Sequence, residues 1–93
     1  MSITKKVVIR NKYGIHVRPS GLLAKEMRKF PDVSFEIDTK DGDGFRLVDG
    51  IMSLVSFELG CGKEILLRAI GDDAEAACES VGNMFGQDFE FEP

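Results

Sequence analysis

Apolar and polar residues alternate along three stretches of the chain, with the period of two that is typical of strands buried on one face. The alternation is clearest in Val33–Asp38 and also covers Thr4–Arg10 and Ile65–Ala69. Phe45–Val48 follows Asp41–Gly44, whose Asp-Gly repeats are typical of a tight turn, and is expected to be a short fourth strand. The pattern therefore predicts four strands, two of which form a hairpin.

Apolar residues at helical spacing separate these strands. The longest such stripe follows Pro19, which suits the first turn of a helix, and ends before Pro31, which cannot continue one. A shorter helix is predicted over Gly50–Glu58, and a third after Asp72–Asp73, whose acidic side chains suit the positive end of a helix. The inner stripes of the first and third helices contain Leu23, Ala24, Met27 and Phe30, and Ala77, Val81, Met84 and Phe85, respectively.

The resulting order βαββαβα predicts an α+β fold, a two-layer open-faced β-sandwich in which helices cover one face of a four-stranded antiparallel sheet. A chain of 93 residues without a linker, repeat or low-complexity segment is expected to form a single domain over residues 1–93. Its last residues, 86–93, are expected to be a loose C-terminal tail.

Charge and composition exclude several classes of partner. The chain has 12 Lys and Arg against 16 Asp and Glu, and its longest basic run is Lys5–Lys6. Nucleic acids and anionic membranes both need clustered cations, so neither is expected as a partner. The chain has neither a signal-peptide pattern nor an apolar run long enough to span a membrane, and we expect it in the cytoplasm.

The residues that commonly bind metals are few and scattered. Cys61 and Cys78 match no metal-ligand spacing, and there is one histidine. We expect both cysteines to be reduced, and we expect no metal site and no cofactor.

That histidine, His16, lies where a strand-ending loop meets a helix N-terminus, in the segment GIHVRPS of Gly14–Ser20. A neutral imidazole is a competent nucleophile that needs no separate base. A phosphoryl group on it would meet backbone N–H groups and the positive end of the helix, and the guanidinium of Arg18 would add directed hydrogen bonds. Besides Arg18, the first helical turn contains Val17, Pro19 and Ser20, and these three residues are the expected phosphate cradle.

The sequence also limits where a phosphoryl group could come from. The chain has no second histidine and no GxxxxGK[ST] nucleotide-binding motif. Any phosphoryl group on His16 must therefore come from, and go to, other macromolecules.

Two segments resemble the HPr family of phosphocarriers. GIHVRPS is similar to the family's active-centre signature GIHARPA, and GIMSL at Gly50–Leu54 is similar to GVMSL on the family's second helix. The resemblance implies that His16 is phosphorylated on Nδ1 by Enzyme I and passes the phosphate to a IIA protein or domain, with Arg18 assisting. It also implies that the protein is a carrier and not an enzyme.

The same resemblance implies a docking surface on the second helix and its neighbouring face. Leu22, Val48 and Met52 are the residues expected to contact partners, although Leu22 and Met52 would also fit an ordinary core. A carrier that visits two partners with one small face must dissociate from each, and we expect a monomer.

The chain departs from the family pattern in ways that bear on regulation and docking. Leu47 occupies the position of the regulatory serine of many Gram-positive relatives, which excludes control by an HPr kinase there. Ser53 matches another family serine but is expected to be an ordinary helix residue. Asp49 stands where the docking patch is commonly apolar. The missing serine, the start NK.G.H.RP and the acidic ending FGQDFEFEP also resemble NPr, the nitrogen-branch relative.

Two other interpretations remain open at this point. One is a non-catalytic regulatory module that binds proteins through the same scaffold without phosphate transfer. The other is a ferredoxin-like domain that binds a small ligand, which fits the topology but leaves the His-Arg-Pro junction unexplained.

Overall fold

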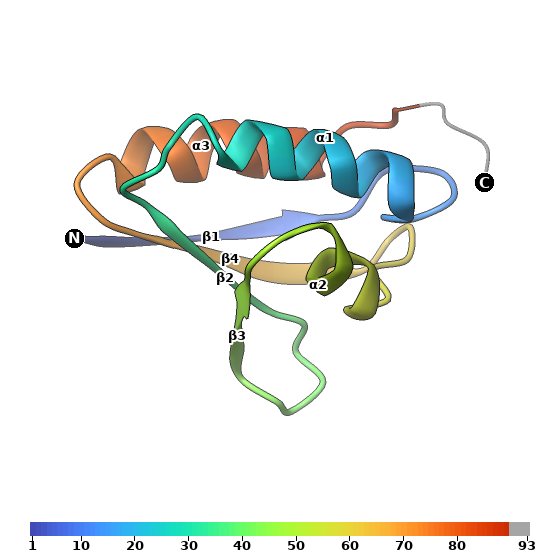
Figure 1. The fold of residues 1–93 in the computed structure, drawn as a ribbon. Helices are drawn as coiled ribbons and strands as arrows, with labels where there is room; N and C mark the ends of the chain where they lie inside the picture. Colours follow the sequence, from blue (N-terminus) through green and yellow to red (C-terminus); the bar gives the residue numbers. More distant parts are fainter. Residues whose placement is uncertain (90–93) are drawn as a thin grey trace.

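The computed structural model describes residues 1–89 and contains three helices packed against one four-stranded sheet (Figure 1). The strands run antiparallel in the order β1-β4-β2-β3. This arrangement confirms the predicted βαββαβα fold. The elements are β1 (Ser2–Val8), α1 (Val17–Met27), β2 (Ser34–Asp38), β3 (Phe45–Val48), α2 (Ile51–Ser56), β4 (Glu64–Ile70) and α3 (Ala74–Phe85).

The two faces of the sheet differ because side chains alternate along each strand. In β4, Ile65, Leu67 and Ala69 are buried on the face that the helices cover. On the open face Arg68 lies opposite Glu36 of β2 and forms an ion pair with it, with N–O distances of 2.5 and 2.7 Å. In Figure 1, α1 and α3 lie side by side above the sheet, and α2 lies below the start of α1.

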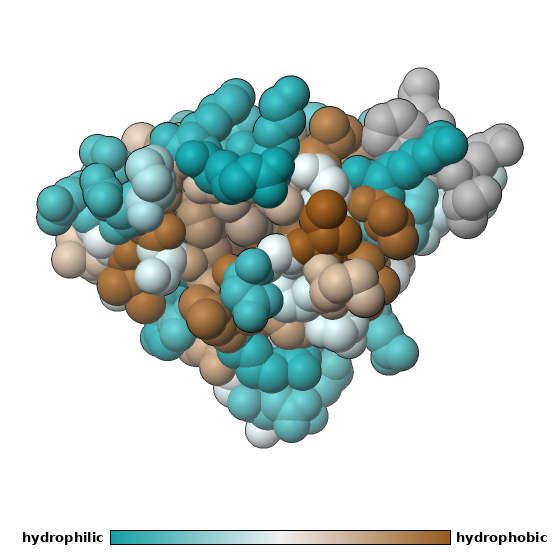
Figure 2. Space-filling view, viewed as in Figure 1, coloured by the Kyte–Doolittle hydropathy of each residue, from teal (hydrophilic) through white to brown (hydrophobic). Residues whose placement is uncertain are grey.

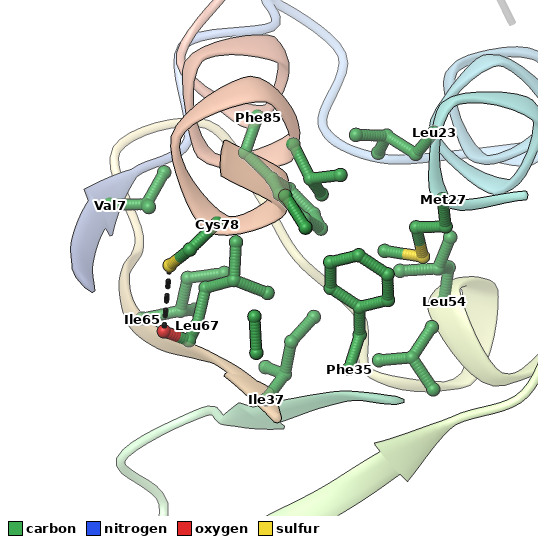
Figure 3. Packing of buried hydrophobic residues seen from close by; sticks show 14 of the residues in the cluster. Val7, Leu23, Met27, Phe35, Ile37, Leu54, Ile65, Leu67, Cys78 and Phe85 are labelled. Atoms are coloured by element: carbon green, nitrogen blue, oxygen red, sulfur yellow. Dashed lines mark hydrogen bonds between the residues drawn. The ribbon is translucent and has the colours of Figure 1, made fainter. Parts of the chain in front are cut away.

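The core lies between the helices and the covered face of the sheet (Figure 3). Phe85 of α3 and Leu23 of α1 are fully buried above Ile37 of β2. Each such side chain stabilises the fold by about 1.5–3 kcal/mol. Cys78 also belongs to this core, where its Sγ lies 3.8 Å from the carbonyl oxygen of Leu67. Burial raises the pKa of the Cys78 thiol, an effect that the charge of Lys5 partly opposes.

The ends of several elements differ from the prediction, and α2 spans Ile51–Ser56 where Gly50–Glu58 was predicted. β1 begins two residues earlier than Thr4–Arg10, since Ser2 already pairs with Ile70 of β4. It also ends two residues earlier, and Ile9 exchanges backbone hydrogen bonds with Gly62 and Lys63 in the loop before β4. α1 begins at Val17 and ends at Met27, although the apolar stripe continues to Phe30. The N–H groups of Lys29 and Phe30 bond three residues back, which tightens the chain out of the α-helix.

The C-terminal segment is attached to the fold as far as it is described. The N–H of Gln87 bonds to the carbonyl oxygen of Met84, and the N–H of Phe89 bonds to the side chain of Asn11. Residues 90–93 of the predicted tail lie outside the described part. Within residues 1–89, none of the helices has the length and apolar character needed to cross a bilayer.

Candidate functional site

His16 ends a loop that is pinned tightly to the loop between α2 and β4. Ile15 is buried, and its N–H bonds to the carbonyl oxygen of Leu59 at 2.8 Å. Gly14 has a φ of 76°, and a Cβ there would lie 2.7 Å from the same oxygen. Only glycine combines this backbone conformation with so close an approach. The backbone that presents His16 therefore has a fixed position.

The histidine itself is the N-cap residue of α1. Its carbonyl oxygen accepts the N–H of Ser20 at 3.0 Å, and its side chain makes no capping hydrogen bond to the helix. The ring is half-buried, and Arg18 in the first turn is exposed, so both side chains are accessible. The first turn contains no acidic residue. The positive end of α1 thus has no carboxylate of its own turn beside it, which favours an anion there.

Of the three residues predicted to cradle a phosphate, two are buried. Val17 is exposed, but Pro19 and Ser20 are buried, and the Ser20 Oγ has no hydrogen-bond partner among residues 1–89. Pro19 lacks an N–H, and the N–H of Ser20 is already bonded to His16. Only Val17 and Arg18 have N–H groups that the helical ladder itself does not use. The backbone of these two residues is what the first turn offers a phosphate.

Three exposed cations are spread along α1 and its C-cap although the net charge is negative. Arg18, Lys25 and Arg28 are exposed on α1. Glu26 is half-buried and binds the ammonium of Lys29 at 2.9 Å and the hydroxyl of Ser80 at 2.7 Å. These two partners lower the pKa of Glu26. The exposed side of α1 is therefore positive and suits an acidic partner or a phosphate.

The three predicted docking residues differ in accessibility. Met52 is 75% exposed, Leu22 is half-buried, and Val48 is only 8% exposed and belongs to the core. Val48 therefore offers little surface to a partner. Ile51 of α2 and Val17, the first residue of α1, are also exposed, and Figure 2 shows hydrophobic side chains gathered where α2 meets the start of α1.

The positions compared with the family pattern, Leu47, Asp49 and Ser53, lie on β3 and around the start of α2. Leu47 is 57% exposed on the edge strand β3. The hydroxyl of Ser53 donates to the carbonyl of Gly50 at 2.8 Å and accepts the N–H of Asp49 at 3.1 Å. Ser53 therefore holds the start of α2, and Asp49 is exposed beside it.

One residue of the site was missed in the sequence. Asn11 is only 1% exposed, and its side chain joins the loop before His16 to the C-terminal segment. An asparagine before a glycine turn is ordinarily an exposed turn residue, so no pattern in the sequence indicated its burial.

Across residues 1–89, no group of histidine, cysteine and acidic side chains is placed to hold a metal ion.

Comparisons with known proteins cover nearly the whole fold. A family model described as "PTS HPr component phosphorylation site" matches residues 3–87. Phosphocarrier protein HPr of Mycoplasma capricolum is 32% identical over 75 residues, 80% of each chain. HPr-like protein Crh of Bacillus subtilis is 34% identical over 80 residues, 85% of this chain and 89% of Crh. The crystal structure of HPr from Bacillus anthracis matches with a TM-score of 0.80 at 29% identity, covering 92% of this chain and 98% of that one.

Proposed function

Because the chain belongs to the HPr family, the phosphocarriers of the phosphotransferase system, we propose that His16 accepts a phosphoryl group from Enzyme I and donates it to a IIA protein or domain. The protein is a carrier and not an enzyme, since it is itself modified and discharged. The observation on which the proposal rests is the place of His16 at the N-cap of α1, in one turn with the exposed Arg18 and without an acidic neighbour in that turn.

The transfer is a displacement at phosphorus. The Nδ1 lone pair of His16 forms a new N–P bond while the bond between phosphorus and the donor protein breaks, and the donor keeps that electron pair. Charge on the phosphoryl oxygens is stabilised by the guanidinium of Arg18 and by the positive end of α1. Discharge to the acceptor reverses these roles, and no cofactor is needed at either step.

Partner contact is expected beside the histidine. Met52 and Ile51 of α2 and Val17, the first residue of α1, are exposed apolar residues, and exposed cations follow along α1. This combination fits a partner with an apolar centre and an acidic rim. Leu22, half-buried on α1, remains a predicted contact. Because two partners would use the same surface in turn, each complex must be transient, which favours a monomer.

Incubation with phosphoenolpyruvate and Enzyme I tests the proposal. Intact-mass measurement should find one phosphoryl group that is lost on acid treatment, as expected for phosphohistidine. His16→Ala should prevent this modification, whereas Thr39→Val, a change in the hairpin between β2 and β3, should leave it intact. An acid-stable adduct, or a phosphoryl group on the His16→Ala variant, would contradict the assignment.

A further inference from the structure

We propose that Asn11 is a positioning residue for His16, which clamps the loop before α1 to the C-terminal segment; the inference rests on the proposed phosphorylation of His16. Asn11 lies between the end of β1 and the turn that leads to the histidine. The residue makes no contact with a phosphoryl group. It acts on the reaction through the backbone that holds the imidazole.

Both ends of the Asn11 amide are used. Its Nδ2 donates to the carbonyl oxygen of Gly14 at 2.6 Å, and its Oδ1 accepts the N–H of Phe89 at 2.8 Å. The N–H of Gly14 bonds back to the carbonyl oxygen of Asn11 at 2.9 Å. The backbone and the side chain of Asn11 thus hold Gly14 from both sides, and a segment 78 residues further along the chain closes over the amide.

Burial makes these hydrogen bonds costly to lose. At 1% exposure, Asn11 has almost no contact with water that could replace its partners. A side chain without the amide would leave the Gly14 carbonyl and the Phe89 N–H to find other partners. The segment from Asn11 to Gly14 would then relax, and the C-terminal segment would lose an anchor.

The position of His16 depends on this loop. Gly14 is two residues before the histidine, and Ile15, between them, is fixed to Leu59. Two restraints therefore define the path of the backbone into the N-cap: the Asn11 clamp on one side and the Leu59 carbonyl on the other. Reacting groups displaced by about 1 Å lose roughly a hundredfold in rate, so a loosened loop should slow transfer.

The C-terminal segment is the second half of the clamp. It follows α3, and the carboxylate of Asp88 accepts the N–H of Lys12 at 3.4 Å, one residue from the Asn11–Phe89 hydrogen bond. Two neighbouring hydrogen bonds, to Asn11 and to Lys12, thereby join the segment after α3 to the loop that leads to His16.

Three variants separate the two ends of the amide. Asn11→Asp keeps the acceptor for Phe89 but places a carboxylate oxygen against the Gly14 carbonyl. A chain that ends at Gln87 keeps the Gly14 contact and removes both Phe89 and the Asp88 contact with Lys12. Asn11→Ala removes both contacts. Thr39→Val is the matched control, because Thr39 is equally buried but lies at the hairpin between β2 and β3, which projects away from the helices (Figure 1).

Phosphoryl transfer from Enzyme I is measured with each variant as the phosphate acceptor. All variants are measured at one temperature, at which the circular dichroism of each shows that it is folded. We expect Asn11→Asp and Asn11→Ala to lower kcat about tenfold with KM changed less than about twofold, and the shortened chain to lower kcat about threefold. Thr39→Val should lower the melting temperature without changing either constant. The NMR chemical shifts of the backbone amides of Ile15 and His16 should change in the three clamp variants and stay unchanged in Thr39→Val.

The outcomes distinguish this inference from the proposed function. If the wild-type protein is not phosphorylated, the proposed function fails, while the amide shifts still test whether Asn11 holds the loop. If the wild-type protein is phosphorylated but the folded Asn11 variants match Thr39→Val in kcat, the positioning role is wrong. If neither Asn11 variant folds and the shortened chain transfers at the wild-type rate, Asn11 has only a structural role and the inference is again overturned.

Discussion

Gly14 packs against the carbonyl oxygen of Leu59 so closely that a Cβ on the glycine would lie 2.7 Å from that oxygen. The contact joins the loop before α1 to the loop before β4, and the neighbouring N–H of Ile15 donates to the same oxygen. A single carbonyl of the α2–β4 connection therefore holds the loop that leads to His16. The contribution of this close contact to stability can be measured separately from the strain of the left-handed backbone conformation.

Gly14→Ala should lower the free energy of unfolding by about 2 kcal/mol or more, because the left-handed conformation costs about 1–2 kcal/mol and the clash with Leu59 adds to it. Gly44→Ala is the matched control, since Gly44 has a φ of 69° but open space around its Cβ position. Gly44→Ala should be destabilised only by the backbone strain, because no atom lies near its Cβ position. Urea unfolding of both variants measures the difference, and equal losses would show that the Leu59 contact contributes nothing.

Much of the architecture could be predicted because the covered face of the sheet imposes a strict alternation. β3 has the predicted bounds Phe45–Val48, and the buried residues of β4 are those of the predicted apolar set. The end of α1 could not be predicted, because Phe30 continues the apolar stripe although its backbone has left the α-helix. Local spacing does not record where tertiary packing tightens a last turn.

The sequence predicts which residues of the candidate site carry its chemistry, but not the contacts that hold them in place. His16 and Arg18 stand out in the sequence because an imidazole and a guanidinium flank a helix start. The burial of Ser20 and Asn11 follows from segments far away in the chain, and Asn11 meets Phe89 only after α3 has crossed the sheet. Such long-range contacts leave no periodic signal.

Ser20→Ala should be neutral or stabilising. The Ser20 hydroxyl is fully buried and lacks a partner among residues 1–89, and alanine is the better helix former. We expect the free energy of unfolding to rise by about 0.5–1 kcal/mol and phosphotransfer to stay unchanged. Chemical denaturation and the Enzyme I assay check the two parts. A less stable variant would mean that the hydroxyl has a partner in the folded protein, and a slower one would give it a role in transfer.

The hydroxyl of Ser80 should stabilise the fold in a pH-dependent way. Its hydrogen bond is the largest cause of the lowered pKa of Glu26, and Lys29 adds to the effect. A carboxylate with a lowered folded-state pKa stabilises the fold above its ordinary value of 4.5, and this stabilisation is lost as the pH falls through the folded-state value. Ser80→Ala should therefore be less stable than wild type near neutral pH, and the difference should shrink as the pH falls below 4.5.

A serine that binds no carboxylate provides the control for that experiment. The hydroxyl of Ser56 donates to the carbonyl oxygen of Ser53 at 2.7 Å, a group that does not titrate. The destabilisation caused by Ser56→Ala should stay constant over the same pH range. Urea unfolding at several pH values compares the two variants, and parallel curves for both would exclude the contribution of Glu26.

Arg18→Ala should slow phosphotransfer without unfolding the protein. Arg18 is exposed, so its removal should change the free energy of unfolding by only about 0.5 kcal/mol. Loss of a charged donor to the transferring group should lower the rate by about a hundredfold, and Arg18→Lys should recover part of it, because an ammonium keeps the charge but not the planar fork. Lys6→Ala removes the same charge from an exposed position on β1 and serves as the control. Lys6 is on another element, so its loss should not affect a direct contact with the phosphoryl oxygens. If Arg18→Ala and Lys6→Ala slow transfer equally, Arg18 acts through net charge alone.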